Sequence, residues 1–215
     1  NIRKAVGYVF TIHIPIAFAS LLAPLLGISP ASLMFLPLHV VLLELVIDPT
    51  CSIVLERQPA EKDIMERAPR KPNEKLLNAR VLTKSLLQGL VIFAASFGTY
   101  FMMLSDFPEN AALARTMGLA VIMLSNVLLV QVNSSDTRYA FQTFMFLIGD
   151  KVMWAVTGGT ILGLLVMLYT PLSTYLKLSA LSITQFLTVA GISIVAVMWY
   201  EVVKLVKKLR MRKFY

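Results

Sequence analysis

Charged residues are scarce in this chain of 215 residues. Asp, Glu, Lys and Arg make up 15% of it, compared with about 25% in soluble domains, while hydrophobic residues make up 57%. This composition excludes a soluble globular domain and identifies an integral membrane protein. The chain has a single cysteine, Cys51, which excludes an internal disulfide framework.

Acidic residues are the scarcer of the two charged kinds, and the formal net charge is +8. A basic balance of this size can indicate nucleic-acid binding, but here the Lys and Arg residues flank apolar runs instead of gathering on one face. We therefore expect a lipid bilayer around the chain and no nucleic-acid partner. Neither a methionine nor a signal-peptide pattern stands at the start, so we expect a piece of a longer protein.

Six predominantly apolar segments are long enough to cross a membrane as helices. They cover residues 5–26, 32–55, 85–105, 116–135, 152–176 and 178–200. The sequence therefore predicts an all-α, multi-pass protein of a bacterial plasma membrane or a eukaryotic cell membrane. Gly159 and Gly163 form a small-xxx-small pair in the fifth segment, which predicts close packing against another helix.

The distribution of basic residues predicts how the six segments are oriented. Eighteen of the 20 Lys and Arg residues lie on one side of the crossings, and Arg115 and Lys177 lie on the other. Because Lys and Arg accumulate in cytoplasmic loops, both termini are predicted to be cytoplasmic. The one sizeable soluble loop, residues 58–75, is either a solvated connector or a docking surface for a cytosolic domain.

The second apolar segment carries two acids near its middle, Glu44 and Asp48. At this spacing they share one helix face, and each costs about 2.5 to 3.5 kcal/mol at the bilayer centre. Pro49 follows directly and cannot donate to the carbonyl of Leu45, so we expect a loosened helix beside the acids. Interrupted helices at membrane depth are tolerated where they line a cavity or an ion site. The pattern predicts half of a cation-binding site.

Other polar residues inside the segments are candidates to complete that site. The amide oxygen of Asn126 could join the coordination shell, although Asn within a membrane helix also bonds to neighbouring helices. His13 could bind the ion or carry a proton, or it could simply bond to another helix. His39 and Gln88 are weaker candidates of the same kind.

The second segment and the loop after it resemble the sixth transmembrane helix and the next cytoplasmic loop of P-type cation ATPases, in the branch that contains the calcium pumps. The residues that carry this resemblance are ELVIDPTCSIVLE continuing to DIMERAPRKP. The opening NIRKAVGYVFTIHIP is similar to the start of their fifth helix, and TPLSTYLKLSALSITQF to the segment joining their ninth and tenth helices. The resemblance implies that residues 1–215 are the six-helix C-terminal half of such a membrane domain.

Parts of the family pattern are missing from the chain. It has neither the Asp-Lys-Thr-Gly-Thr phosphorylation motif nor the Pro-Glu-Gly-Leu of the fourth helix. The resemblance thus implies that the first four helices, the ATP-binding and phosphorylation domains and the Mg-ATP site belong to the rest of a parent pump, an ATPase and cation translocase. The chain alone would hold no cofactor and would neither hydrolyse ATP nor pump.

Site residues are carried over from the family one by one. Asp48 matches the sixth-helix aspartate that is shared between ion sites. Glu44 stands where calcium pumps have an asparagine and where sodium/potassium and proton/potassium pumps have an acid. Asn126 falls at an eighth-helix glutamate, and His13 and Ile16 fall at a fifth-helix asparagine and glutamate of the sarcoplasmic-type calcium pump. Because Ile16 cannot bind a metal, we expect one of the two calcium sites to be missing.

The functional prediction is a single Ca²⁺ site made by Glu44, Asp48 and Asn126, completed by carbonyls of a helix outside this chain. Repulsion between the two carboxylates in the ion-free state predicts that one of them takes up a proton, hence proton countertransport. A monovalent-cation pump of the sodium/potassium or proton/potassium type is the first alternative, because of the acid at Glu44. A self-standing membrane scaffold without transport is the second.

Overall fold

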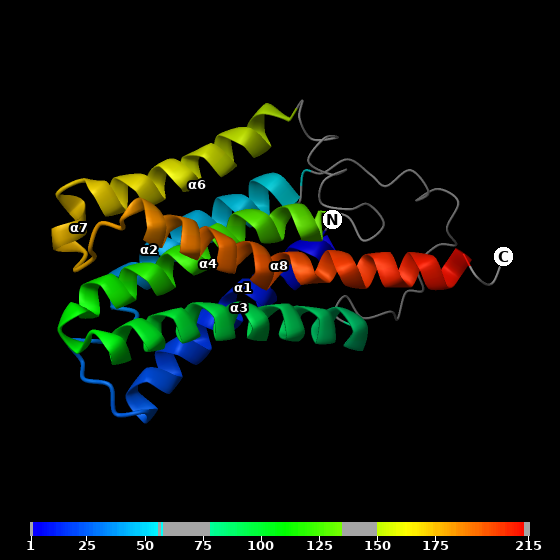
Figure 1. Ribbon diagram of the computed structural model, residues 1–215. Helices are drawn as coiled ribbons and strands as arrows, with labels where there is room; N and C mark the ends of the chain where they lie inside the picture. Colours follow the sequence, from blue (N-terminus) through cyan, green and yellow to red (C-terminus); the bar gives the residue numbers. More distant parts are fainter. Residues whose placement is uncertain (1, 56, 58–77, 135–149, 213–215) are drawn as a thin grey trace.

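The computed structural model describes residues 2–55, 57, 78–134 and 150–212. In these residues the chain is helical and has no strand, and six helices are long and apolar enough to cross a membrane (Figure 1). The predicted all-α fold with six membrane-spanning helices is confirmed. The predicted loop at 58–75 lies outside the described residues, so its role stays a prediction.

The helices follow one another with short connections. They are α1 (Ile2–Leu25), α2 (Pro37–Pro49) with the π-helix η1 (Thr50–Leu55), α3 (Ala79–Asp106), the 3₁₀ turn η2 (Pro108–Asn110), α4 (Ala111–Asn133), α6 (Lys151–Tyr169), the short α7 (Leu172–Tyr175) and α8 (Ile183–Arg212). Most boundaries differ by several residues from those predicted, and the differences have local causes.

Side-chain caps move two helix starts. The Asn78 side chain accepts a hydrogen bond from the backbone N–H of Val81 at 2.9 Å, so α3 begins six residues before the predicted start. Asp150 caps α6 in the same way, through the first two backbone N–H groups that follow Lys151. Proline at the first helical position starts α2 at Pro37, where its fixed φ suits a helix and its missing N–H has no cost.

Two helix ends were also predicted differently. We expected the fifth segment to run to residue 176, but α6 ends at Tyr169 because Pro171 cannot continue a helix. We expected the last segment to end at residue 200, but α8 continues to Arg212. Lys and Arg are good helix formers, so the basic tail prolongs the helix even though it is too polar for lipid.

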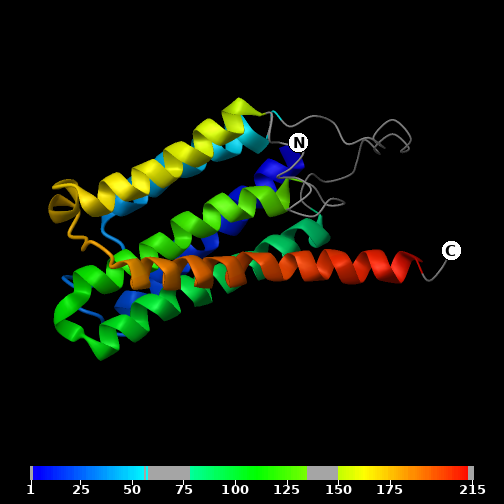
Figure 2. The same cartoon turned by 45° about the horizontal axis from the view of Figure 1, so that its top comes forward.

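Helix α4 is the centre of the bundle. In its membrane segment 78% of the residues are buried, against 38% in the segment formed by α2 and η1. Helices α3 and α8 pack along α4, α1 packs mainly on α3, and α6 and η1 lie against each other at the outside (Figure 2). The start of α1 and the end of α8 lie at the same end of the bundle (Figures 1 and 2). That this end faces the cytoplasm stays a prediction.

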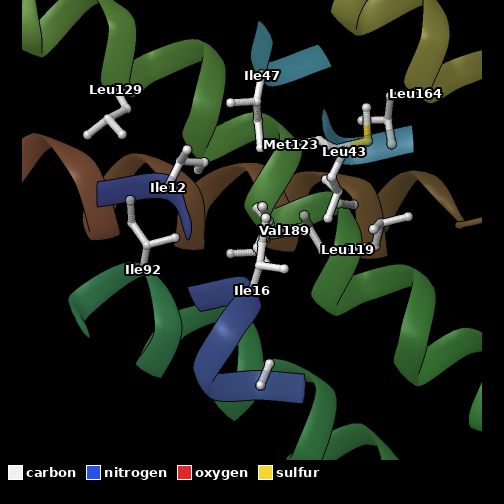
Figure 3. Packing of buried hydrophobic residues seen from close by; sticks show 14 of the residues in the cluster. Ile12, Ile16, Leu43, Ile47, Ile92, Leu119, Met123, Leu129, Leu164 and Val189 are labelled. Carbon is white, nitrogen blue, oxygen red and sulfur yellow. The ribbon is translucent and has the colours of Figure 1, made fainter. Parts of the chain in front are cut away.

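Buried hydrophobic residues from every long helix meet around α4 (Figure 3). Leu119 and Met123 of α4 lie among Ile12 and Ile16 of α1 and Ile47 of α2. The prediction that position 16 cannot serve the ion agrees with this placement, because the side chain is part of the apolar core. The core thus fixes α1 and α2 on the side of α4 where the candidate site lies.

Glycine allows close approach at two helix contacts. A Cβ at Gly118 would lie 2.6 Å from Met34 Cε and 3.0 Å from Tyr100 Cβ, and one at Gly89 would lie 2.7 Å from the carbonyl oxygen of Thr11. The close packing predicted at the two α6 glycines is wrong for the described part of the chain. A Cβ built on Gly159 or on Gly163 has no described atom of another residue within 4 Å, apart from its chain neighbours and its own helix.

Two lysines donate hydrogen bonds to carbonyls at the C-terminal end of α4, beside the start of α1. Lys4 of α1 donates from Nζ to the carbonyl of Ser134 at 2.9 Å, and Lys204 of α8 donates to the carbonyl of Val132 at 2.7 Å. These carbonyls belong to the last turn, where helix carbonyls lack a partner within the helix and a positive charge is favourable. The contacts fasten α1 and α8 to α4.

Candidate cation-binding site

Glu44 and Asp48 lie one turn apart in the second half of α2, directly before the change of helix type. Pro49 ends the α-helix, and the π-helix η1 begins at Thr50. Proline offers no N–H to the carbonyl of Leu45, and its ring crowds that carbonyl, so the regular α-helical pattern is disrupted here. The irregularity predicted beside the acids is confirmed. Short π stretches inside helices are frequent at functional sites.

Glu44 pairs with His13 across the contact between α2 and α1. Its Oε1 lies 3.0 Å from His13 Nε2, and the two side chains are 36% and 42% exposed. The other ring nitrogen, Nδ1, lies 2.8 Å from the carbonyl oxygen of Val9 one turn earlier in α1. The pair is therefore held on the side of the helix and not inside the apolar core.

The hydrogen bonds of His13 determine where protons can sit. A backbone carbonyl only accepts, so Nδ1 must donate to Val9. The contact between Nε2 and Glu44 then needs a second proton, carried either by the imidazole or by the carboxyl group.

The two acids lie away from the buried face of α2. That face consists of His39, Leu43 and Ile47, whereas Glu44 is half-buried and Asp48 is exposed in the described part of the chain. The two acids therefore do not take part in the apolar contacts of α2 with the core.

Asn126 lies elsewhere, in the interior of α4. It is buried, and its Oδ1 accepts a hydrogen bond from the hydroxyl of Tyr8 of α1. Its Nδ2 has no hydrogen-bond partner among the described residues. Tyr8 was not singled out from the sequence; the only signal was a phenol at membrane depth, because a buried tyrosine hydroxyl usually finds a partner.

Two of the predicted ligands, Glu44 and Asn126, therefore each contact a different residue of α1. His13 contacts Glu44, and Tyr8 contacts Asn126. Tyr8 and His13 are five residues apart, which turns them about 140° from each other around the helix axis. Among the residues described, no group of three or more His, Cys, Asp and Glu could hold a metal ion. That Glu44, Asp48, Asn126 and His13 bind one ion stays a prediction.

The two weaker candidates have different surroundings. His39 is buried, with both ring nitrogens in use: Nδ1 accepts from the N–H of Leu36 at 3.2 Å, and Nε2 donates to the carbonyl of Leu176 at 2.8 Å. Gln88 is buried too, and neither atom of its amide has a partner within the described ranges. His39 is thus a structural residue at the start of α2, with no lone pair left for a metal.

The position of Arg115 differs from the one predicted from the sequence. We expected it just outside the fourth segment, but α4 begins at Ala111 and contains Arg115 as a buried residue. It does lie at the same end as Lys177, as predicted, because its guanidinium donates to the Lys177 carbonyl.

Comparison with known proteins gives consistent matches. Relatives include the calcium-transporting ATPase of Bacillus subtilis, 28% identical over 90% of this chain, and calcium-transporting ATPase 1 of Lactococcus lactis, 26% identical over 96% of it. The sodium/potassium-transporting ATPase subunit alpha of Drosophila melanogaster is 35% identical over 49% of the chain. These matches cover 21%, 23% and 10% of the relatives, so the chain spans at most about a quarter of their length.

A family match covers most of the chain. Residues 32–206 match the family described as cation transporting ATPase, C-terminus. This range includes α2 with both acids and the helices that follow it, up to residue 206 within α8. Together with the six membrane-length helices, it establishes that the chain belongs to the C-terminal region of the cation-transporting P-type ATPases.

Proposed function

We propose that this chain is the part of an ATP-driven cation pump that binds the transported ion, through Glu44 and Asp48. The observation that carries the proposal is the position of the two acids: one turn apart, on the side of α2 that is not buried, directly before the π-helix. Interrupted helices at membrane depth line ion sites in other transporters. Backbone carbonyls of a preceding helix in the parent pump would complete the coordination.

We propose Ca²⁺ as the ion. Carboxylate and carbonyl oxygens suit this hard cation, which takes about six to eight oxygen ligands. Glu44 and Asp48 supply carboxylates, and the names of the Bacillus and Lactococcus relatives point the same way. ATP binding and phosphorylation would belong to the remainder of the parent, so the chain alone would be inactive.

Proton countertransport is part of the same proposal. Two carboxylates about 6 Å apart repel each other by roughly 3 kcal/mol at an effective dielectric constant of 20. Once the ion leaves, one proton would relieve this repulsion, and the contact of Glu44 with His13 provides a place for it. A pump reconstituted in proteoliposomes should then move protons against the cation, read with an internal pH-sensitive dye. Cation transport without any such counterflow would contradict this step.

A monovalent-cation pump is the second candidate. Glu44 favours it through the family resemblance, since sodium/potassium and proton/potassium pumps have an acid at this position where calcium pumps have an asparagine, and the Drosophila relative is named for sodium and potassium. Phosphoenzyme formation from ATP, measured across Ca²⁺, Mn²⁺, K⁺ and Na⁺, separates the two candidates. Stimulation by K⁺ or Na⁺ alone would replace the Ca²⁺ proposal.

The decisive experiment uses Asp48→Asn and Glu44→Gln in the parent pump. Both changes keep the side-chain shape and remove a charge, so we expect loss of ion-dependent phosphoenzyme for Asp48→Asn and at least a tenfold higher half-saturating ion concentration for Glu44→Gln, on the order of 1.4 kcal/mol. Glu109→Gln is the matched control, because Glu109 is an exposed acid in η2 and should not affect the ion response. Unchanged transport in Asp48→Asn would overturn the proposed site, and a wild-type parent without any ion response would favour the scaffold alternative.

A further inference from the structure

Arg115 is a fully buried cation with only 1% of its surface exposed. Its guanidinium donates to three backbone carbonyls: Nη2 to Ala31 at 2.8 Å, Nε to Leu33 at 2.8 Å and Nη1 to Lys177 at 2.7 Å. The first two carbonyls belong to the connection between α1 and α2, and the third to the turn between α7 and α8. One side chain of α4 therefore joins two connections that are far apart in the sequence.

The connection before α2 is held by a second donor as well. The hydroxyl of Tyr100, from α3, donates to the carbonyl of Ser32 at 2.6 Å. Three consecutive carbonyls, those of Ala31, Ser32 and Leu33, thus each accept a hydrogen bond from a side chain of α3 or α4. A loop with three carbonyls in a row fixed this way has little freedom to shift.

The fixed loop leads straight into the helix with the two acids. Helix α2 begins at Pro37, four residues after Leu33, and His39 in its first turn donates to the carbonyl of Leu176. Glu44 lies seven residues beyond Pro37, about 10 Å along the axis. The first turn of α2 is therefore held by the loop on one side and by the α7–α8 turn on the other.

Between its first turn and η1, the buried side chains of α2 are Leu43 and Ile47, and η1 itself packs against α1 and α6. Where Glu44 meets His13 is therefore set by the core and η1 on one side of the acids and by the held first turn on the other. We propose that Arg115 is a positioning residue for the cation site, acting through the α1–α2 connection to keep Glu44 and Asp48 in place. This inference rests on the proposed function of the two acids.

Arginine suits this task better than lysine does. The guanidinium is a planar fork with five N–H donors, and here three of its nitrogens reach carbonyls of two separate segments. A lysine ammonium has its donors on one atom and cannot span the same three acceptors. Arg115→Lys keeps the charge and loses the bridge, so it separates the two contributions.

The test measures the ion concentration that gives half-maximal phosphoenzyme in the full parent pump, purified in detergent. We expect Arg115→Lys to raise it about tenfold, and Tyr100→Phe, which removes only the hydroxyl on Ser32, to raise it about threefold, with both variants still reaching the maximal phosphoenzyme level. Tyr169→Phe is the matched control. Its hydroxyl donates to the carbonyl of Leu181 at 2.8 Å and not to the α1–α2 connection through which the inference acts, so we expect no change.

The outcomes distinguish the inference from the proposed function. If Arg115 has only a structural role, Arg115→Lys lowers the amount of folded pump, but the folded molecules keep the wild-type half-maximal ion concentration. That result would overturn the inference, whereas an ion response of the wild-type pump would still support the proposed function. If Arg115→Lys does not fold, the half-maximal ion concentrations of Tyr100→Phe and Tyr169→Phe are compared instead. A higher value for Tyr100→Phe alone supports the inference, and equal values overturn it. A wild-type pump without ion response would overturn both.

Discussion

Helices α4 and α2 both carry polar groups in their apolar segments, but these groups differ in burial and in hydrogen bonding. In α4, Arg115 is buried and its hydrogen bonds go to three carbonyls, and the Thr116 hydroxyl accepts from the N–H of Ser179. In α2, Glu44 is half-buried beside His13, and Asp48 is exposed. The comparison separates buried polar groups that hydrogen-bond to other segments from the half-buried and exposed acids that we propose as ion ligands. Removing a buried hydrogen-bonding group of α4 should cost stability, as well as ion affinity where that group positions α2, whereas variants at the α1–α2 pair should affect the ion response with little loss of stability.

The largest effect is expected for Arg115→Leu. It removes the donor from the carbonyls of Ala31, Leu33 and Lys177, and a hydrogen bond from a charged group contributes about 1.5 to 3 kcal/mol, so we expect a loss of about 3 kcal/mol or more. Thermal unfolding of the solubilised pump, followed by the loss of monodisperse protein, measures it. Glu44→Gln, at a half-exposed group, should leave the unfolding temperature nearly unchanged; equal destabilisation of the two variants would break the comparison.

The next effect concerns packing against α4. Gly118→Ala places a Cβ against Tyr100 Cβ and the carbonyl of Ser96, so we expect overpacking to cost about 1 to 3 kcal/mol by the same thermal assay. Gly159→Ala in α6 is the matched control, because a Cβ there meets nothing in the described chain. It should be neutral or up to about 1 kcal/mol more stable, as alanine is the better helix former. A clear loss in Gly159→Ala would indicate that another helix of the parent packs there.

A smaller effect is expected for Tyr8→Phe. The change removes the hydroxyl that donates to Asn126 and leaves a buried amide oxygen without this partner, which costs about 1 kcal/mol. If Asn126 also contacts the ion, the half-saturating ion concentration should move as well, since the freed oxygen is then available to it. A change in stability alone would mean that Asn126 joins helices and does not bind the ion.

The smallest effect on stability is expected for His13→Gln. Pairs as exposed as His13 and Glu44 contribute about 0 to 1 kcal/mol, so the unfolding temperature should hardly change. The ion response should become less dependent on pH, because glutamine cannot carry the proton shared with Glu44. The half-saturating ion concentration measured from pH 6 to pH 8 checks this, and a pH profile identical to the wild type would contradict it.

The number and kind of helices could be predicted because lipid imposes a simple rule: each crossing needs a long apolar run. The break at Pro49 could be predicted as well, since it depends on the chemistry of one residue. The burial of Arg115 could not be predicted, because a charged residue near the end of an apolar segment usually indicates the edge of the membrane. Its carbonyl partners also lie 62 to 84 positions away in the sequence. The contact of Asn126 with Tyr8 was hidden for the same reason: spacing along one helix says nothing about which face of α1 receives each neighbour.

The hydrogen bonds at the two ends of α4 have a mechanical consequence. Arg115 ties one end to the connections at that end of the bundle, while Lys4 and Lys204 grip the carbonyls of the other. Sliding α4 along its axis would break all of these contacts together, whereas tilting the outer half of α2 would break few of them. These hydrogen bonds therefore hold α4 in place along its axis, and the segment around Pro49 makes none of them.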